Sequence, residues 1–391
     1  MRSRKNDSVQ GHEVYRHVED VLRQHLKLKD HGPKCRLSVL VAILCYAAAR
    51  IGSIFDACRR LRDAPCDQAV RDALFAMLPQ PAELTRRLNS GLAADLPDAV
   101  LGRRVNVAVD LTLIPYHGQP LHDEKEVYRG QPKHGTSHFH AYATCYMAWK
   151  GRRFTLAMVP VWKGDSMKDV LQRLLQRARA VGVKIKLVLL DRGFYSVEVI
   201  RYLQAARTPF LMPLVRRGRK PKNGDPLSGS RQFHAWKQSG WSQYTLTDKK
   251  KRTATVRVAV ACRNYRGKWN RHGRQTFVYA YWGCHPGSMQ WVYQTYRRRF
   301  GIESSYRQLN QARIRTCTRN PALRLLLVGM ALILRNAWVW FHLLVFAERH
   351  RNGQIILRLE KLRFRTLLLW TQRYAEALLG CSETISLELQ T

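Results

Sequence analysis

Val105-Asn-Val-Ala-Val-Asp110 and Lys184-Ile-Lys-Leu-Val-Leu-Leu-Asp191 are two short apolar runs, and each of them ends in an aspartate. Runs of this length and composition, rich in β-branched residues, predict buried strands. In an α/β sheet the ends of neighbouring strands meet at a crevice where ligands bind. We therefore expect Asp110 and Asp191 to lie close together, at the ends of adjacent strands.

The segments around these two runs alternate between strand-like and helix-like patterns. Residues 101–213 contain further predicted strands at 139–149, 153–162 and 209–213, and predicted helices at 165–181 and 196–206. This alternation indicates an α/β sheet with helices on its faces. We take 101–213 as the first part of the α/β domain.

The alternation stops at residue 214, after a short predicted strand. Residues 214–290 begin with a basic, turn-rich loop and contain two strand-like runs, 253–262 and 276–282, which predict a hairpin. This segment is a β-rich insertion. A predicted helix over 290–311 carries Glu303, and residues 291–345 complete the α/β domain.

The two ends of the chain are predicted to be helical. Residues 1–100 contain short helices at 37–49, 53–61 and 67–77, which fit either a helix-turn-helix DNA reader or a plain helical bundle. We assign 1–100 as a DNA-binding domain with that alternative open. Residues 346–391 form a predicted helical C-terminal tail.

One apolar stretch, residues 323–346, has the length of a membrane span. Four polar side chains interrupt it: Arg324, Arg335, Asn336 and His342. Charges in the middle of a span are costly in lipid. We therefore expect a buried core helix and no membrane partner.

The net charge points to a polyanionic partner. The sequence has 67 Lys+Arg against 28 Asp+Glu, a formal net charge of +39. Such an excess repels itself in a compact fold, and nucleic acid relieves that repulsion. An anionic membrane surface is the competing explanation, but the basic residues are spread through the chain and not gathered on one amphipathic helix.

Cysteine usage and the N-terminus bear on localisation. The nine cysteines include no Cys-x-x-Cys pair and no Cys/His group with zinc spacing. Their scatter predicts reduced, mostly buried thiols. The polar N-terminal residues precede no apolar segment of a secretory signal. We expect a cytoplasmic, nucleoid-associated protein.

A third acid, Glu303, completes a candidate metal-binding set with Asp110 and Asp191. Carboxylates and water suit Mg²⁺ or Mn²⁺, and two such ions can hold the attacking and leaving oxygens of a phosphoryl transfer. If residues 290–311 form one continuous helix, at about 100° per residue, several neighbours share the face of Glu303. They are Tyr296, Arg299, Arg307, Asn310 and Arg313. Arginines and an aromatic ring on one face suit a DNA backbone and a displaced base.

Tyr296-Arg-Arg-Arg-Phe-Gly-Ile-Glu303 resembles the Tyr-x-x-Arg-x-x-x-Glu-x-x-x-x-x-x-Lys signature of insertion-sequence DDE transposases. Gly135-Thr-Ser-His-Phe-His-Ala-Tyr142, Trp162-Lys-Gly-Asp-Ser166 and Leu190-Asp-Arg-Gly-Phe-Tyr195 resemble the same family, so the likeness covers roughly residues 100–340. It implies an RNase H-like mixed sheet, catalysis by the three acids, and an insertion that contacts DNA near the cut. The position of the signature lysine is Asn310 here, a neutral residue, and Arg313 is the nearby substitute.

Other candidate DNA contacts flank these motifs. Arg192 and Lys163 adjoin the second acid and the Trp162 motif, and either could bind phosphate or only offset the charge of the acids. Four tryptophans of the insertion and its flank are candidates for stacking on an extruded base: Trp236, Trp241, Trp269 and Trp291. His117, His138 and His140 are better explained as structural residues, and we leave them out of the catalytic set.

The function that these features predict is DNA transposition: metal-dependent cleavage at the ends of an element and strand transfer into target double-stranded DNA, by at least a homodimer. One alternative is a metal-dependent endonuclease that cuts without joining. The other is a DNA-binding protein whose active site has decayed, although intact acids in all three motifs argue against it.

Overall fold

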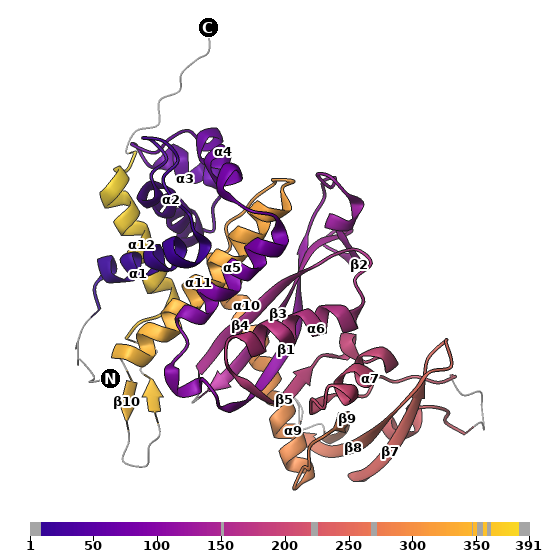
Figure 1. The fold of residues 1–391 in the computed structure, drawn as a ribbon. Coiled ribbons are helices and arrows are strands. Elements are labelled where there is room, and N and C mark those ends of the chain that lie inside the picture. The colour runs from indigo at the N-terminus through magenta and orange to yellow at the C-terminus, as the bar shows by residue number, and fades with distance from the viewer. Residues whose placement is uncertain are drawn as a thin grey trace.

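The structure is a computed structural model that describes residues 9–149, 152–219, 226–266, 272–345, 347–349, 355–357 and 361–382. Within these residues nine strands form one mixed sheet, and helices cover both of its faces (Figure 1). A second helical body lies beside the sheet. The predicted α/β class, with helical N- and C-terminal regions, is confirmed.

The centre of the sheet has the strand order β4-β3-β1-β5-β6. β1, β3 and β4 form an antiparallel meander, whereas β5 and β6 run parallel to β1. β2 pairs with the start of β3. The bounds are β1 Arg104–Pro115, β2 Tyr128–Lys133, β3 Thr136–Trp149, β4 Arg152–Val161, β5 Lys184–Leu190 and β6 Phe210–Pro213.

The β-rich segment 214–290 continues this sheet and does not form a separate one. β9 pairs antiparallel with β6, in the register Phe210↔Trp282, and β8 and β7 follow outward. The predicted hairpin is β8 with β9, and β7 is a strand that the sequence did not indicate. The bounds are β7 Gly240–Thr247, β8 Thr253–Arg266, β9 His272–Trp282 and α8 Arg231–His234. The active-site sheet therefore extends directly into the insertion.

The side chains of β1 alternate between two cores, as the two-residue period of a strand requires. Val107 and Val109 belong to the main core with α6 (Met167–Ala180) and α7 (Val197–Ala205). Ala108 faces the other way, into a smaller cluster that includes Tyr296 of α9 (Met289–Arg297). Asp110 has the parity of Ala108 and so lies on the face that α9 and α10 (Gly301–Ala312) cover.

The helical body joins the two ends of the chain. The last helix, α12, packs against α1 and α2, so the predicted tail folds back onto the N-terminal helices (Figure 1). The bounds are α1 Gly11–Val21, α2 Leu37–Arg50, α3 Ile54–Arg60, α4 Asp67–Met77, α5 Pro81–Ala94, α11 Pro321–Val345 and α12 Phe364–Leu379. Short strands β10 (Ala347–Arg349) and β11 (Ile355–Leu357) pair with each other.

α11 is the predicted core helix. By length and composition it could cross a membrane, but its apolar window is 100% buried inside the protein. Asn320 caps its N-terminus by accepting a hydrogen bond from Leu323 N at 3.0 Å. Its polar residues have protein partners: Arg335 donates to the Gln308 side chain and to Arg153 O. These contacts explain how α11 carries polar groups in the core.

Two buried asparagines form hydrogen bonds with backbone groups on the outer edge of β4. Asn89 of α5 accepts from Met158 N at 2.7 Å and donates to Met158 O at 2.9 Å. Asn336 of α11 forms the same pair with Thr155, at 3.0 and 2.9 Å, and also donates to Leu92 O. Buried backbone groups need partners, and here side-chain amides take the place of a further strand.

All nine cysteines are free. Three are buried (Cys35, Cys45, Cys145), three are partly buried (Cys58, Cys262, Cys284) and three are exposed (Cys66, Cys317, Cys381). The expectation of mostly buried thiols therefore holds for fewer of them than the sequence suggested, because several lie in loops at the surface.

Candidate active site

Asp110 and Asp191 lie next to each other, as the two apolar runs predict. β1 and β5 are parallel neighbours with Val109 opposite Leu190, and an acid follows each of these residues. Asp191 comes directly after β5, as predicted, but β1 continues to Pro115, so Asp110 lies within its strand and not at its end. Asp110 is held in place by Leu111 N, which donates to its Oδ1 at 2.8 Å. Its side chain is 18% exposed, and that of Asp191 is 37% exposed. The two carboxylates thus form a half-buried acidic pair.

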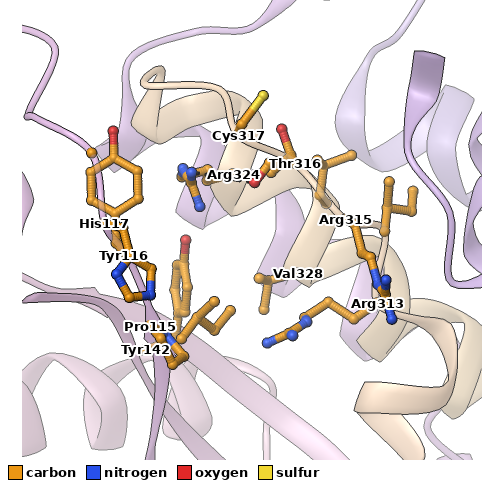
Figure 2. Close-up of a pocket in the computed structure, with 14 residues that line it drawn as sticks. Pro115, Tyr116, His117, Tyr142, Arg313, Arg315, Thr316, Cys317, Arg324 and Val328 are labelled. Atoms are coloured by element: carbon orange, nitrogen blue, oxygen red, sulfur yellow. Dashed lines mark hydrogen bonds between the residues drawn. The ribbon is translucent and has the colours of Figure 1, made fainter. Parts of the chain in front are cut away.

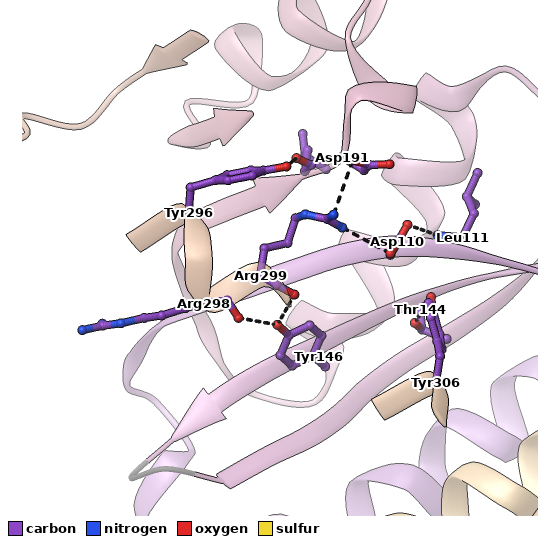
Figure 3. A network of polar contacts seen from close by, with 10 residues as sticks. Asp110, Leu111, Thr144, Tyr146, Asp191, Tyr296, Arg298, Arg299 and Tyr306 are labelled. Atoms are coloured by element: carbon purple, nitrogen blue, oxygen red, sulfur yellow. Dashed lines mark hydrogen bonds and ion pairs between the residues drawn. The ribbon is translucent and has the colours of Figure 1, made fainter. Parts of the chain in front are cut away.

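Arg299 joins these two carboxylates (Figure 3). Its Nη1 lies 3.2 Å from Asp110 Oδ2, and its Nη2 lies 3.4 Å from Asp191 Oδ1. The arginine side chain is only 6% exposed. Burial raises the pKa of Asp110, and the Arg299 guanidinium opposes that rise. The two acids therefore converge on a single cation, which here is a guanidinium.

The turn that carries Arg299 is fixed by two tyrosines. The Tyr146 hydroxyl of β3 lies 2.9 Å from both Arg298 O and Arg299 O, and its hydrogen is shared between them. The Tyr296 hydroxyl donates to Leu190 O, the carbonyl just before Asp191, at 3.3 Å. The positions of the arginine and of the second acid are thereby tied to the sheet.

Residues 290–311 are helical, as predicted, but they do not form one continuous α-helix. α9 ends at Arg297, residues Arg298–Phe300 form a 3₁₀ turn, and α10 starts at Gly301. The Tyr146 hydroxyl donates to the backbone carbonyls at this turn. Gly301 packs so closely on Arg153 that a Cβ at position 301 would collide with the Arg153 side chain. Because the helix is broken, the single face deduced for Glu303 and its neighbours does not exist in that form.

Glu303 lies in the first turn of α10. α10 packs against the face of β1 that carries Asp110, and the Tyr306 hydroxyl lies 2.8 Å from Thr144 Oγ1, directly across from Asp110 in the β1–β3 pairing. The side chain of Glu303 lies outside the described part of the structure. Among the described side chains, no group of three His, Cys, Asp or Glu comes together.

The structure distributes the predicted DNA-contact residues over several places. Tyr296, Arg299 and Arg192 line a cavity of about 630 Å³ beside Asp191, together with Tyr279 and Tyr293. Arg307 and Asn310 are exposed on α10. Arg313 follows α10 and lines a different cavity. Lys163 forms an ion pair with Glu124 and does not line the cavity beside Asp191.

The predicted stacking tryptophans are also dispersed. Trp241 is 46% exposed on β7 and Trp291 is 36% exposed on α9, whereas Trp236 is partly buried against Phe233. Trp269 lies outside the described residues. The aromatic side chains that line the cavity beside Asp191 are Phe277, His234 and three tyrosines, of which the sequence singled out only Tyr296. The alternation of Phe277, Tyr279 and Tyr281 in β9 was the available signal, since residues two apart in a strand share a face.

This strand order, with one acid in β1, one directly after the parallel strand β5 and a helix returning to the same face, defines an RNase H-like domain. The sequence profile of the transposase DDE domain family matches residues 102–337, and the chain belongs to that family. DNA is therefore its partner by class. Divalent metal ions are the family's general cofactor.

Among solved structures, a cryo-EM structure of piggyBac transposase in a synaptic complex with hairpin DNA is similar in fold. The TM-score is 0.55 at 10% sequence identity, over 98% of this chain and 85% of that chain. No curated protein matches the sequence.

Proposed function

We propose that this protein is a DNA transposase that cuts at the ends of its element and joins the freed 3′-hydroxyl to target DNA, with Asp110, Asp191 and Glu303 as metal-binding catalytic acids. The observation that carries the proposal is the convergence of Asp110 and Asp191 on one cation, from the adjacent parallel strands β1 and β5. Glu303 enters from α10, which packs on the same face of the sheet.

The donor set suits two Mg²⁺ or Mn²⁺ ions. Both described acids present carboxylate oxygens, which these hard ions prefer, and both are near enough to one point to share a cation. When bound, the ions supply charge stabilisation for the attacking and leaving oxygens of a phosphoryl transfer. Asp110, oriented by Leu111 N, would hold the ions together with Asp191 and Glu303.

Arg299 has a defined place in this proposal. Its guanidinium lies between the two carboxylates and compensates their charge. Metal binding requires it to give up at least one of these contacts, and the adjacent scissile phosphate is then the anion closest to it. The Tyr146 hydrogen bond keeps the turn in place during this exchange.

The cavity beside Asp191 fits the DNA next to the cut. Tyr279, Tyr293 and Tyr296 offer aromatic rings for a base, and Arg192 and Arg299 offer charges for the backbone. Arg307 and Asn310 are exposed on the helix of Glu303 and would follow the strand outward. In the same proposal 1–100 and 214–290 bind flanking DNA, and a homodimer holds two ends within the nucleoid.

The test is cleavage of DNA that carries the terminal repeats flanking the gene. Asp110→Asn, Asp191→Asn and Glu303→Gln should each lower the rate at least about 100-fold, the upper range for residues that merely support metal ligands. Asp98→Asn makes the same chemical change at an exposed site and should retain activity. Full cleavage by Asp110→Asn would refute the assignment.

Strand transfer distinguishes this function from that of a nuclease. Pre-cut ends with a free 3′-hydroxyl should be joined to a target plasmid by the wild-type protein and not by the three acid variants. Cleavage without joining would identify an endonuclease. A decayed DNA-binding protein would show neither activity, and its Mg²⁺ binding would be unchanged after all three acids were replaced.

A further inference from the structure

A second basic cavity, of about 520 Å³, lies beyond the end of β1. Tyr116 and Tyr142 form one wall, and the other comes from the segment between α10 and α11 and from the first turns of α11 (Figure 2). Neither Asp110 nor Asp191 lines it. It is therefore separate from the acidic pair and from the cavity beside Asp191.

Three arginines line this cavity without an acid: Arg313, Arg315 and Arg324. In the described part of the chain, no carboxylate pairs with any of them. Burial lowers the pKa of Arg313 and of Arg324, and at Arg313 the neighbouring Arg315 lowers it further. Arg324 is buried and Arg313 is half-buried, whereas Arg315 is exposed, and concentrating the two more buried charges without a counter-ion is costly. An anion that enters the cavity would remove that cost.

Arg324 is held ready for such an anion. It is 6% exposed, and its Nε donates to Thr318 O at 2.6 Å while its Nη2 lies 3.4 Å from Thr316 O. The guanidinium carbon lies 4.6 Å from the centre of the Tyr116 ring. Figure 2 shows the Arg313 and Arg324 side chains directed towards the space around Tyr142. A fixed arginine fork matches the oxygens of a phosphate group.

We propose that this cavity binds a backbone phosphate of the DNA flanking the cut. The strand register places it on the face of the catalytic acids: Asp110 is opposite Thr144, and Tyr142 is opposite Thr112, one pair further along. Tyr116 follows six residues after Asp110, roughly 20 Å along an extended strand. The inference rests on the proposed DNA cleavage, because the acids define where the DNA lies.

The test uses Arg313→Gln with Arg315→Gln, and leaves Arg324 in place because it also supports the loop at residues 316–318. The probe is duplex DNA that carries one terminal repeat, and the measurement is affinity against salt concentration. Each lost phosphate contact should reduce the slope of log K on log salt by about 0.9. Arg104→Gln, an exposed arginine at the other end of β1, should leave the slope unchanged.

Neutral methylphosphonates placed one at a time in the DNA identify the phosphate. A methylphosphonate at one position other than the scissile phosphate should weaken DNA binding by the wild-type protein and have no effect on DNA binding by the double variant. Thermal unfolding tests for a structural role. Replacing arginines that repel one another should not lower the Tm, whereas replacing arginines that support the fold would lower it. An unchanged salt slope in a folded double variant overturns the proposal.

Two further outcomes separate the possible ligands. If inorganic phosphate or a free nucleotide raises the Tm of the wild-type protein but not of the double variant, and the DNA slope is unchanged, the cavity binds a small phosphate and not DNA. In each outcome that contradicts binding of a DNA phosphate, cleavage of element-end DNA by the wild-type protein means that the proposed function stands and only this inference fails.

Discussion

Arg299 is the residue on which the site depends in the absence of metal. It contacts both acids from a turn that two tyrosines hold, and it is more deeply buried than either carboxylate. An acidic pair that close together would otherwise repel. The arginine therefore keeps the two acids in place, and in the proposed function it does so until metal ions and DNA bind.

Replacing Arg299 should expose this role. Arg299→Gln leaves the two carboxylates without their cation, so the metal-free protein should lose on the order of 1–3 kcal/mol of stability. Because the competing charge is gone, Mg²⁺ should raise the Tm of the variant more than that of the wild type. Arg298→Gln, an exposed neighbour, is the control. Equal Mg²⁺ shifts in variant and wild type would contradict the competition.

His140 makes stability depend on pH. It is 4% exposed on β3, its ring packs edge-on against Tyr116, and burial followed by the charge of Arg324 lowers its pKa to about 3. The unfolded chain, with an ordinary histidine pKa near 6.5, binds the proton first. Stability from this group is therefore complete above pH 6.5 and declines as the pH falls towards 3.

The size of this decline can be measured. At about 1.4 kcal/mol per pH unit, wild-type protein should lose roughly 2 kcal/mol more between pH 7 and pH 5 than His140→Phe. Urea unfolding at the two pH values gives both numbers. Parallel losses in the two proteins would show that His140 is already protonated in the folded state.

At the scale of elements, β4 is an edge strand, since β3 is its only neighbour in the sheet among the described residues. Asn89 and Asn336 come from α5 and α11 and close its outer edge with amide hydrogen bonds. The helical body is thereby attached to the sheet through polar contacts within an apolar interface. A hydrophobic pattern alone would not explain an asparagine at either of these buried positions.

Asn336→Leu should therefore be strongly destabilising although it makes the core more apolar. It leaves Thr155 N, Thr155 O and Leu92 O without this partner, and the expected loss is about 3 kcal/mol or more. Asn310→Leu, at an exposed position of α10, should stay within about 0.5 kcal/mol of wild type. An equally small loss of stability for Asn336→Leu would mean that water or backbone movement provides hydrogen-bond partners for the edge of β4.

The sequence predicted β5 and the extent of the helical segment 290–311, but it missed β7, the continuation of β1 beyond Asp110 and the break between α9 and α10. β5 was expected at 184–190 and is Lys184–Leu190, because an apolar run that ends in an acid is a local signal. The break between α9 and α10 was missed because Tyr146, more than a hundred residues away in the chain, fixes it. Arg299 was predicted to bind DNA; its contacts with both acids follow from that tertiary arrangement and from no local pattern.

The whole molecule combines one extended sheet with a strongly basic surface. The insertion strands continue the catalytic sheet through β6 and β9, so the acids and the basic cavities belong to one continuous framework. A net charge of +39 attracts DNA without selecting a sequence. In the proposed function, a sequence preference would have to come from other contacts, such as those assigned to residues 1–100 and 214–290.

The central claim is that these acids bind the catalytic metal ions, and exchanging the metal tests it most directly. A thiolate is a poor ligand for Mg²⁺ and a better one for Mn²⁺. Cleavage of element-end DNA by Asp191→Cys should be lost in Mg²⁺ and at least partly restored in Mn²⁺, whereas Asp191→Ser should stay inactive in both. Equal responses of the cysteine and serine variants to Mn²⁺, or full Mg²⁺ activity of either, would contradict the account.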